Sequence, residues 1–130
     1  MAAVPAVGPT GCSATATSMC IAGRFQIEVQ YQTAQGGGVA GSGQAIGLQS
    51  LGVGRGGLFW FFAADNPEML VKVLDACSLN DRFWIFYAAG TNVGFTLTVT
   101  DTQTGETRTY HNPDATSAPP VQDTSALPCA

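Results

Sequence analysis

The residue types that most often perform acid–base or nucleophilic chemistry are scarce in this chain of 130 residues. His111 is the single histidine, and it follows Tyr110 on a threonine-rich segment, with no Gly-x-Ser-x-Gly turn anywhere in the sequence. A Ser-His-Asp hydrolase needs an imidazole beside its nucleophile. We therefore interpret His111 as a surface or edge-strand residue and expect a protein that is not an enzyme.

Carboxylates gather in two turn-like segments, Asp65 with Glu68 and Asp75 with Asp81. Such pairs could hydrolyse glycosides if their carboxyl groups lay about 5 to 9 Å apart, and with neighbouring asparagine carbonyls they could bind calcium. Neither segment has EF-hand spacing, and both have the composition of ordinary turns. We expect no catalytic residues, no cofactor and no metal, and these four carboxylates are the candidates should a calcium site exist.

Aromatic residues offer the clearest candidate for binding, because eight of the twelve lie in two short runs, 59–62 and 83–87. Alternate residues of a strand point to opposite faces, so each run places rings on both faces of a sheet. One face is predicted to be core and carries Phe59, Phe61, Phe83, Ile85 and Tyr87. The other carries the candidate ligand-binding residues Trp60, Phe62, Trp84 and Phe86, with Lys72 between them. Loops, leader or tail could cover this second face, or it could bind sugars or a protein partner.

The elements that position these rings are predicted to be strands. Residues 25–32 alternate apolar with polar, as do residues 93–100, and Gly105 suits the left-handed position of a hairpin loop. The segment 69–76 favours strand over helix because of Val71 and Val73. The prediction is an all-β fold, a single antiparallel β-sandwich or partly open barrel of about seven strands with no long helix. Residues 1–19 form an extended leader, 20–113 the β-domain, and 114–130 a tail packed on its surface.

Four cysteines, an even number without a Cys-x-x-Cys motif, predict two disulfides. Three pairings are possible, and we favour Cys12 with Cys20 and Cys77 with Cys129. Oxidised cysteines indicate a secreted or periplasmic protein. The opening "MAAVPAVGPTG" lacks the basic start and apolar run of a signal peptide, so we interpret Met1 as a start added to a mature chain. No apolar run has the length that a membrane span needs.

The charge of the chain narrows the choice of partners. Its net charge is -4, only 11% of its residues are charged, and its five basic residues are scattered. Such a chain has no patch that could neutralise phosphates. We therefore expect neither binding to nucleic acid nor insertion into a membrane. The expected partner is a polysaccharide or an extracellular protein.

The segments "GRFQIEV", "LFWFFAADNPEMLVKVLDACSLNDRFWIFY" and "TNVGFTLTVTDTQTGETRTYHNP", followed by "VQDT", resemble a disulfide-containing β-domain that recurs in secreted bacterial proteins. The likeness covers about residues 12–126, and Pro67 departs from the apolar residue expected there. The resemblance implies an accessory or terminal module and no catalytic residues.

Three functions remain open. The first is a noncatalytic binding or adhesion module, with polysaccharide bound by the sheet aromatics. The second is a secreted inhibitor of a protease or other hydrolase that uses the segment after Cys77. The third is a structural protein that assembles through strand edges or the leader.

Overall fold

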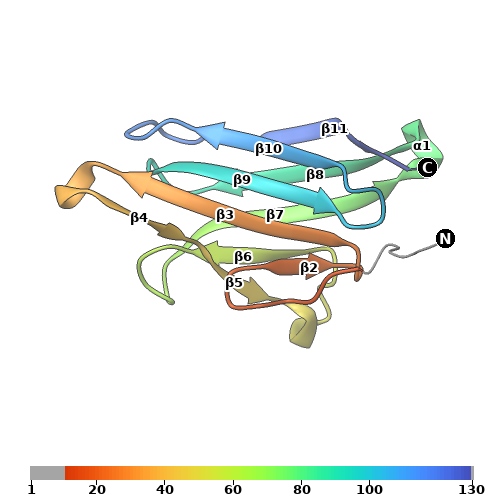
Figure 1. Cartoon of the computed structure of the whole chain (residues 1–130), viewed down its shortest axis with the longest axis horizontal. Coiled ribbons are helices and arrows are strands. Elements are labelled where there is room, and N and C mark those ends of the chain that lie inside the picture. The colour runs from red at the N-terminus through yellow and green to blue at the C-terminus, as the bar shows by residue number, and fades with distance from the viewer. Residues whose placement is uncertain (1–10, 130) are drawn as a thin grey trace.

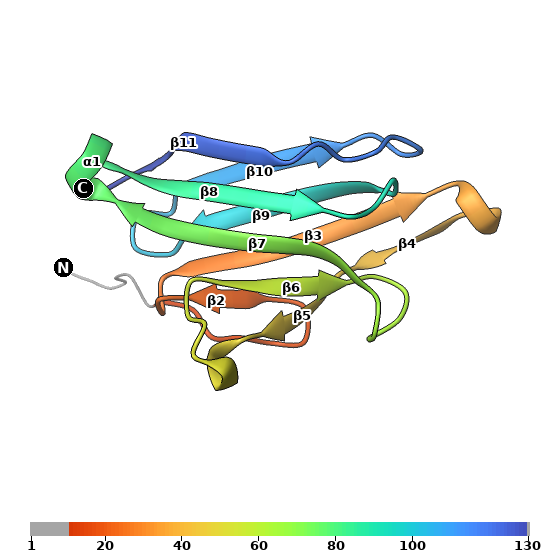
Figure 2. The same cartoon turned by 180° about the vertical axis from the view of Figure 1, so that it is seen from behind.

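The computed structural model describes residues 11–129, which form two antiparallel five-stranded sheets packed face to face (Figure 1). Sheet I has the order β10-β9-β3-β2, and β4 also pairs with β3; sheet II has the order β11-β8-β7-β6-β5 (Figure 2). This two-layer arrangement confirms the all-β sandwich and is not a closed barrel. The elements are β2 (Met19–Ile21), β3 (Phe25–Thr33), β4 (Val39–Ser42), β5 (Gln44–Gly47), β6 (Gly56–Trp60), β7 (Pro67–Ala76), α1 (Cys77–Asn80), β8 (Arg82–Ala89), β9 (Gly94–Asp101), β10 (Thr107–Asn112) and β11 (Val121–Pro128).

Sheet I follows the alternation of its sequence. In the pairing of β3 with β9, Ile27 lies opposite Val99 and Val29 opposite Leu97, and all four side chains are fully buried. The residues that alternate with these four are glutamine, glutamate and threonine, and their side chains point away from the core. The β9–β10 hairpin turns at Gly105, whose φ of 80° is the left-handed conformation predicted for it.

Sheet II contains the predicted meander of β6, β7 and β8. Residues 69–76 are strand, as their β-branched residues predict, and the short helix α1 follows this strand. Pro67 opens β7 beside a register shift between Phe59 and Trp60. A proline is tolerated there because the first residue of a strand or a bulge need not donate to the ladder.

The core lies between the sheets. Its predicted members Phe59, Phe61, Phe83, Ile85 and Tyr87 are all buried, the most exposed being Phe83 at 9%. The inner rings of the two sheets meet across this space, with Phe25 edge-on to Phe83 at 4.8 Å and Tyr31 stacked on Phe61 at 4.7 Å between centroids. One apolar core therefore serves both sheets.

Three segments depart from the predicted layout and raise the strand count to ten. Strand β2 begins at Met19, the last residue of the expected leader, and its Met19 and Ile21 are buried, whereas residues 1–10 lie outside the described residues. The glycine-rich segment 36–47 forms two short strands, β4 and β5, which belong to different sheets. The expected surface tail forms β11, which pairs with β8 at the edge of sheet II. Edge strands accept proline and irregular pairing, which explains why the tail lacked a strand signature.

Both predicted disulfides are confirmed. Cys12 bonds to Cys20, and Cys77 bonds to Cys129. The second bridge joins α1 to the end of β11, so it fastens the last strand to the body of sheet II. Together the two disulfides indicate an oxidising environment, extracellular or periplasmic.

Candidate functional site

The outer face of sheet II is apolar over most of its area. Its strand register brings the side chains into rows, for example Ile46, Leu58, Leu70 and Ala88. Within residues 11–129 the molecule has two layers, and no third layer lies over this surface (Figures 1 and 2). We call it the aromatic face and define it by Gln44, Ile46, Leu58, Trp60, Leu70, Lys72, Leu74, Arg82, Trp84, Phe86, Ala88, Gln122 and Thr124.

The outer face of sheet I has the opposite character. Its register aligns Gln26 with Thr100, Glu28 with Thr98, and Gln30 with Thr96. Polar side chains of this kind are what a solvated sheet face normally presents. The contrast between the two outer faces makes the aromatic face the unusual surface of the molecule, because monomers rarely expose a continuous apolar patch.

Two rings of β8 form the centre of the aromatic face. Trp84 and Phe86 are stacked, with 5.7 Å between ring centroids and 12° between their planes. The indole N–H of Trp84 donates a 2.9 Å hydrogen bond to Oδ1 of Asn80, and Nδ2 of Asn80 donates at 2.8 Å to the carbonyl of Thr124. The polar edge of the indole is thereby held by α1 and β11, and its flat ring is fixed in orientation.

Lys72 of β7 supplies the charge beside these rings. It pairs with Phe86 in the register, and its Nζ lies 5.6 Å from the centroid of the Phe86 ring, a cation–π distance. On its other side Lys72 lies opposite Gly56, which has no side chain. Lys72, Trp84 and Phe86, predicted together from sequence, are therefore brought together by the fold.

The other two predicted rings lie elsewhere. Trp60 is on the aromatic face but pairs with Pro67, whereas Trp84 pairs with Leu74. At about 3.3 Å per residue these rows are roughly 20 Å apart along the strands, so the two indoles do not form the single cluster that their strand order suggested. Phe62 follows the end of β6 and packs edge-on against Tyr31 at 5.2 Å.

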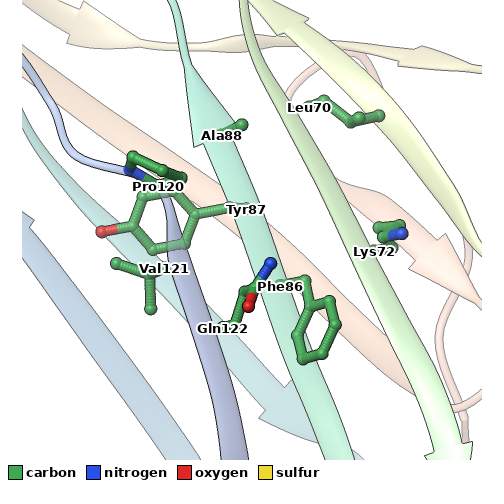
Figure 3. A pocket seen from close by; sticks show the side chains of 8 residues that line it. All are labelled: Leu70, Lys72, Phe86, Tyr87, Ala88, Pro120, Val121 and Gln122. Atoms are coloured by element: carbon green, nitrogen blue, oxygen red, sulfur yellow. The ribbon is translucent and has the colours of Figure 1, made fainter.

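A hollow of about 210 Å³ opens next to Phe86 on the aromatic face (Figure 3). It lies over Ala88, and its rim comes from β7 and from the start of β11. The side chain of Ala88 is small, and the larger side chains around it form the walls of the hollow. The lining residues are Leu70, Lys72, Phe86, Tyr87, Ala88, Pro120, Val121 and Gln122.

The carboxylates proposed for calcium lie at the two ends of β7. Asp65 lies in the β6–β7 turn, at the far end of β7 from Asp75, whose Oδ1 accepts the amide of Cys77. Glu68 is buried and accepts a 3.1 Å hydrogen bond from Asn66. Among residues 11–129, no group of three acidic, histidine or cysteine side chains could hold a metal ion.

His111 lies on the outer face of sheet I, where its Nδ1 is 3.2 Å from the hydroxyl of Thr96. Both residues are in a row with Gln30, and no carboxylate among residues 11–129 is hydrogen-bonded to the imidazole. This pair lacks the orienting carboxylate of a hydrolytic triad.

Sequence reasoning missed the residues that β11 and α1 contribute. The sequence suggests Asn80 as a turn residue or a calcium ligand, and it places Pro120 and Gln122 in a surface tail. The predicted Cys77–Cys129 bridge could have indicated them, since it brings the end of the chain beside β8. The eight residues directly before Cys129 are enough to form an edge strand there.

Comparisons with protein-family models, with curated proteins and with solved structures find no match to this chain. In the part of the chain that the structure describes, no helix has the length and apolar character to cross a membrane. The fold and the site together define a disulfide-bonded β-sandwich with an uncovered aromatic sheet face.

Proposed function

We propose that this protein is a noncatalytic extracellular binding module that holds polysaccharide on its aromatic face. The observation that carries the proposal is the stacked pair of Trp84 and Phe86, which stands on a sheet face that no described segment covers. Flat apolar rings favour the C–H faces of sugar rings, and a fixed indole loses little conformational freedom when it binds. Secretion and a bacterial accessory role, implied by the resemblance, accord with this use.

A sheet surface suits a long ligand better than a small one. Sites for drug-sized molecules enclose roughly 300–1,000 Å³, and the hollow beside Phe86 holds about 210 Å³. It accommodates one unit of a chain whose other units lie along β8. The aromatic face extends from Trp84 at one end to Trp60 at the other, which provides a path for several units.

The test is affinity electrophoresis on soluble polysaccharides together with pull-down on insoluble ones. We expect retention by at least one polymer, loss of retention in Trp84→Ala and Phe86→Ala, and unchanged thermal midpoints. His111→Ala is the matched control, because it changes an exposed ring on the opposite sheet. The proposal is wrong if no polymer retains the protein. It is also wrong if the two substitutions on the aromatic face do nothing except unfold the protein.

The inhibitor and assembly alternatives stay predictions. The segment proposed for an inhibitor, beginning at Cys77, is the helical turn α1, although Leu79 within it is 74% exposed. Protease clefts bind substrate-like loops in extended form, so this turn is not arranged for such a role. Stoichiometric inhibition of a secreted protease would revive it.

A further inference from the structure

The aromatic face carries positive charge without compensating negative charge. Lys72 projects from its centre and Arg82 from the end of β8. The two ion pairs among residues 11–129 are Arg24–Asp101 and Arg108–Glu106, and Lys72 belongs to neither. The ammonium group of Lys72 lies over the Phe86 ring instead.

All nine acidic side chains lie in the described part of the chain, and none of them is paired with Lys72 in the strand register or lines the hollow. Asp101 is bonded to Arg24 and Asp123 to Tyr110, both towards the space between the sheets. Glu28, Glu106 and Asp114 belong to sheet I and its turns. Those of sheet II lie at strand ends or in turns, namely Asp65, Glu68, Asp75 and Asp81.

This distribution is notable because the chain as a whole has a net charge of -4. Lys72 is exposed on a face that also carries Leu70, Leu74 and Phe86, and opposite charges near a protein surface attract each other more strongly than in bulk water. Gln122, across the hollow, offers amide donors that point to the same space (Figure 3).

We infer that the polysaccharide bound at the aromatic face is acidic, with a carboxylate or sulfate group of one sugar unit at Nζ of Lys72. The ring of that unit occupies the hollow over Ala88, and the neighbouring unit lies on Phe86 and Trp84. This inference rests on the proposed function and specifies its ligand class. Apolar contact supplies affinity along the chain, and Lys72 selects polymers that carry negative charge.

Two pairs of polymers that differ mainly in charge test the inference. Polygalacturonate is compared with its methyl ester, and dextran sulfate with dextran, by titration calorimetry on the whole chain. We expect one or both charged polymers to bind roughly tenfold more tightly than the uncharged counterpart, as one charge-assisted contact allows. Added salt should reduce this difference. The preferred charged polymer identifies the anion as carboxylate or sulfate.

Variants assign the selectivity to Lys72. Lys72→Gln should lower affinity for the charged polymer to that for the uncharged one, Lys72→Arg should retain it, and Ala88→Leu should weaken both by filling the hollow. Arg55→Gln is the matched control, because it removes one exposed positive charge from a loop off this face. Equal binding of charged and uncharged polymers, or equal losses in Lys72→Gln and Arg55→Gln, would overturn the inference yet leave polysaccharide binding intact. Failure of every polymer to bind would remove both.

Discussion

Asp101 accepts two hydrogen bonds of 2.8 Å from the guanidinium of Arg24, and its side chain is completely buried. Arg24 in turn lies against two rings, 5.1 Å from the centroid of Phe25 on sheet I and 4.7 Å from that of Phe83 on sheet II. The ion pair therefore closes one end of the sandwich and links its layers, whereas the aromatic face remains free of charge pairs.

Loss of one partner of this pair should be costly. Asp101→Asn leaves the Arg24 cation without its counter-charge in a largely buried setting, and we expect a loss of about 3–5 kcal/mol in the free energy of unfolding. Denaturant unfolding of Asp101→Asn, Arg24→Met and the double variant measures the coupling. The double variant should lose clearly less than the sum of the single variants, and strict additivity would contradict a direct interaction.

Acid should destabilise the protein through the same carboxylate. Burial would raise the pKa of Asp101, but the hydrogen bonds from Arg24 and from the amide of Gln103 outweigh it and hold the pKa below its ordinary value of 3.8. A carboxyl group with a lowered folded pKa contributes stability that is complete above its unfolded pKa and is lost as the pH falls through the folded value. Stability should decline below about pH 4 to 5.

Asp114 should add to this decline, because hydrogen bonds from the amide of Ala34 and from neighbouring groups lower its pKa as well. Unfolding measured between pH 2 and pH 7 should give a shallower acid slope for Asp101→Asn than for the unmodified chain, and a shallower slope again for Asp101→Asn with Asp114→Asn. Parallel slopes for all three proteins would show that these carboxylates are not responsible.

The sequence could predict what is local and periodic. Alternation identified β3 and β9 because each has one face in the core, and the same alternation assigned Phe59 and Phe83 to the interior correctly. It could not give the distance between Trp60 and Trp84, since strand register depends on the bulge beside Pro67 and on turn lengths. It also missed β11, whose pairing with β8 is long-range and whose prolines weaken any strand signal.

The two disulfides should differ in their contribution to stability. Cys77–Cys129 spans 52 residues and Cys12–Cys20 spans 8. In the chain-entropy account, closing the longer loop stabilises by about 4 kcal/mol and the shorter by about 2.5 kcal/mol. Replacing both cysteines of each pair by serine and measuring thermal unfolding should rank the losses in that order.

Loss of the longer bridge should also affect the candidate site. The Cys77–Cys129 bridge fastens β11 beside β8. When it is removed, amide hydrogen exchange should accelerate in Val121–Pro128 more than in β3 or β9. Retention by polysaccharide should weaken with it, since Gln122 and Pro120 form one wall of the hollow. Uniform acceleration across both sheets would contradict a local role.

Gly43 is the residue at which the chain leaves sheet I for sheet II, between β4 and β5. A Cβ there would clash with Cγ1 of Val29 and lie 3.2 Å from the Phe61 ring, and both side chains are buried and unable to withdraw. Its φ is not in the left-handed region, so the requirement for glycine is steric. Gly43→Ala should therefore destabilise by about 1–3 kcal/mol through overpacking.

Gly54→Ala is the control for this substitution, because a Cβ at Gly54 would meet no atom within 4 Å and its φ also lies outside the left-handed region. Its unfolding free energy should stay within about 0.5 kcal/mol of the unmodified protein. If the two alanine variants lost equal stability, the cost would come from backbone entropy or strand propensity and not from the approach of Val29. If Gly43→Ala alone is destabilised, the close crossing at this residue fixes how near the two sheets pack, and with it the spacing of the core.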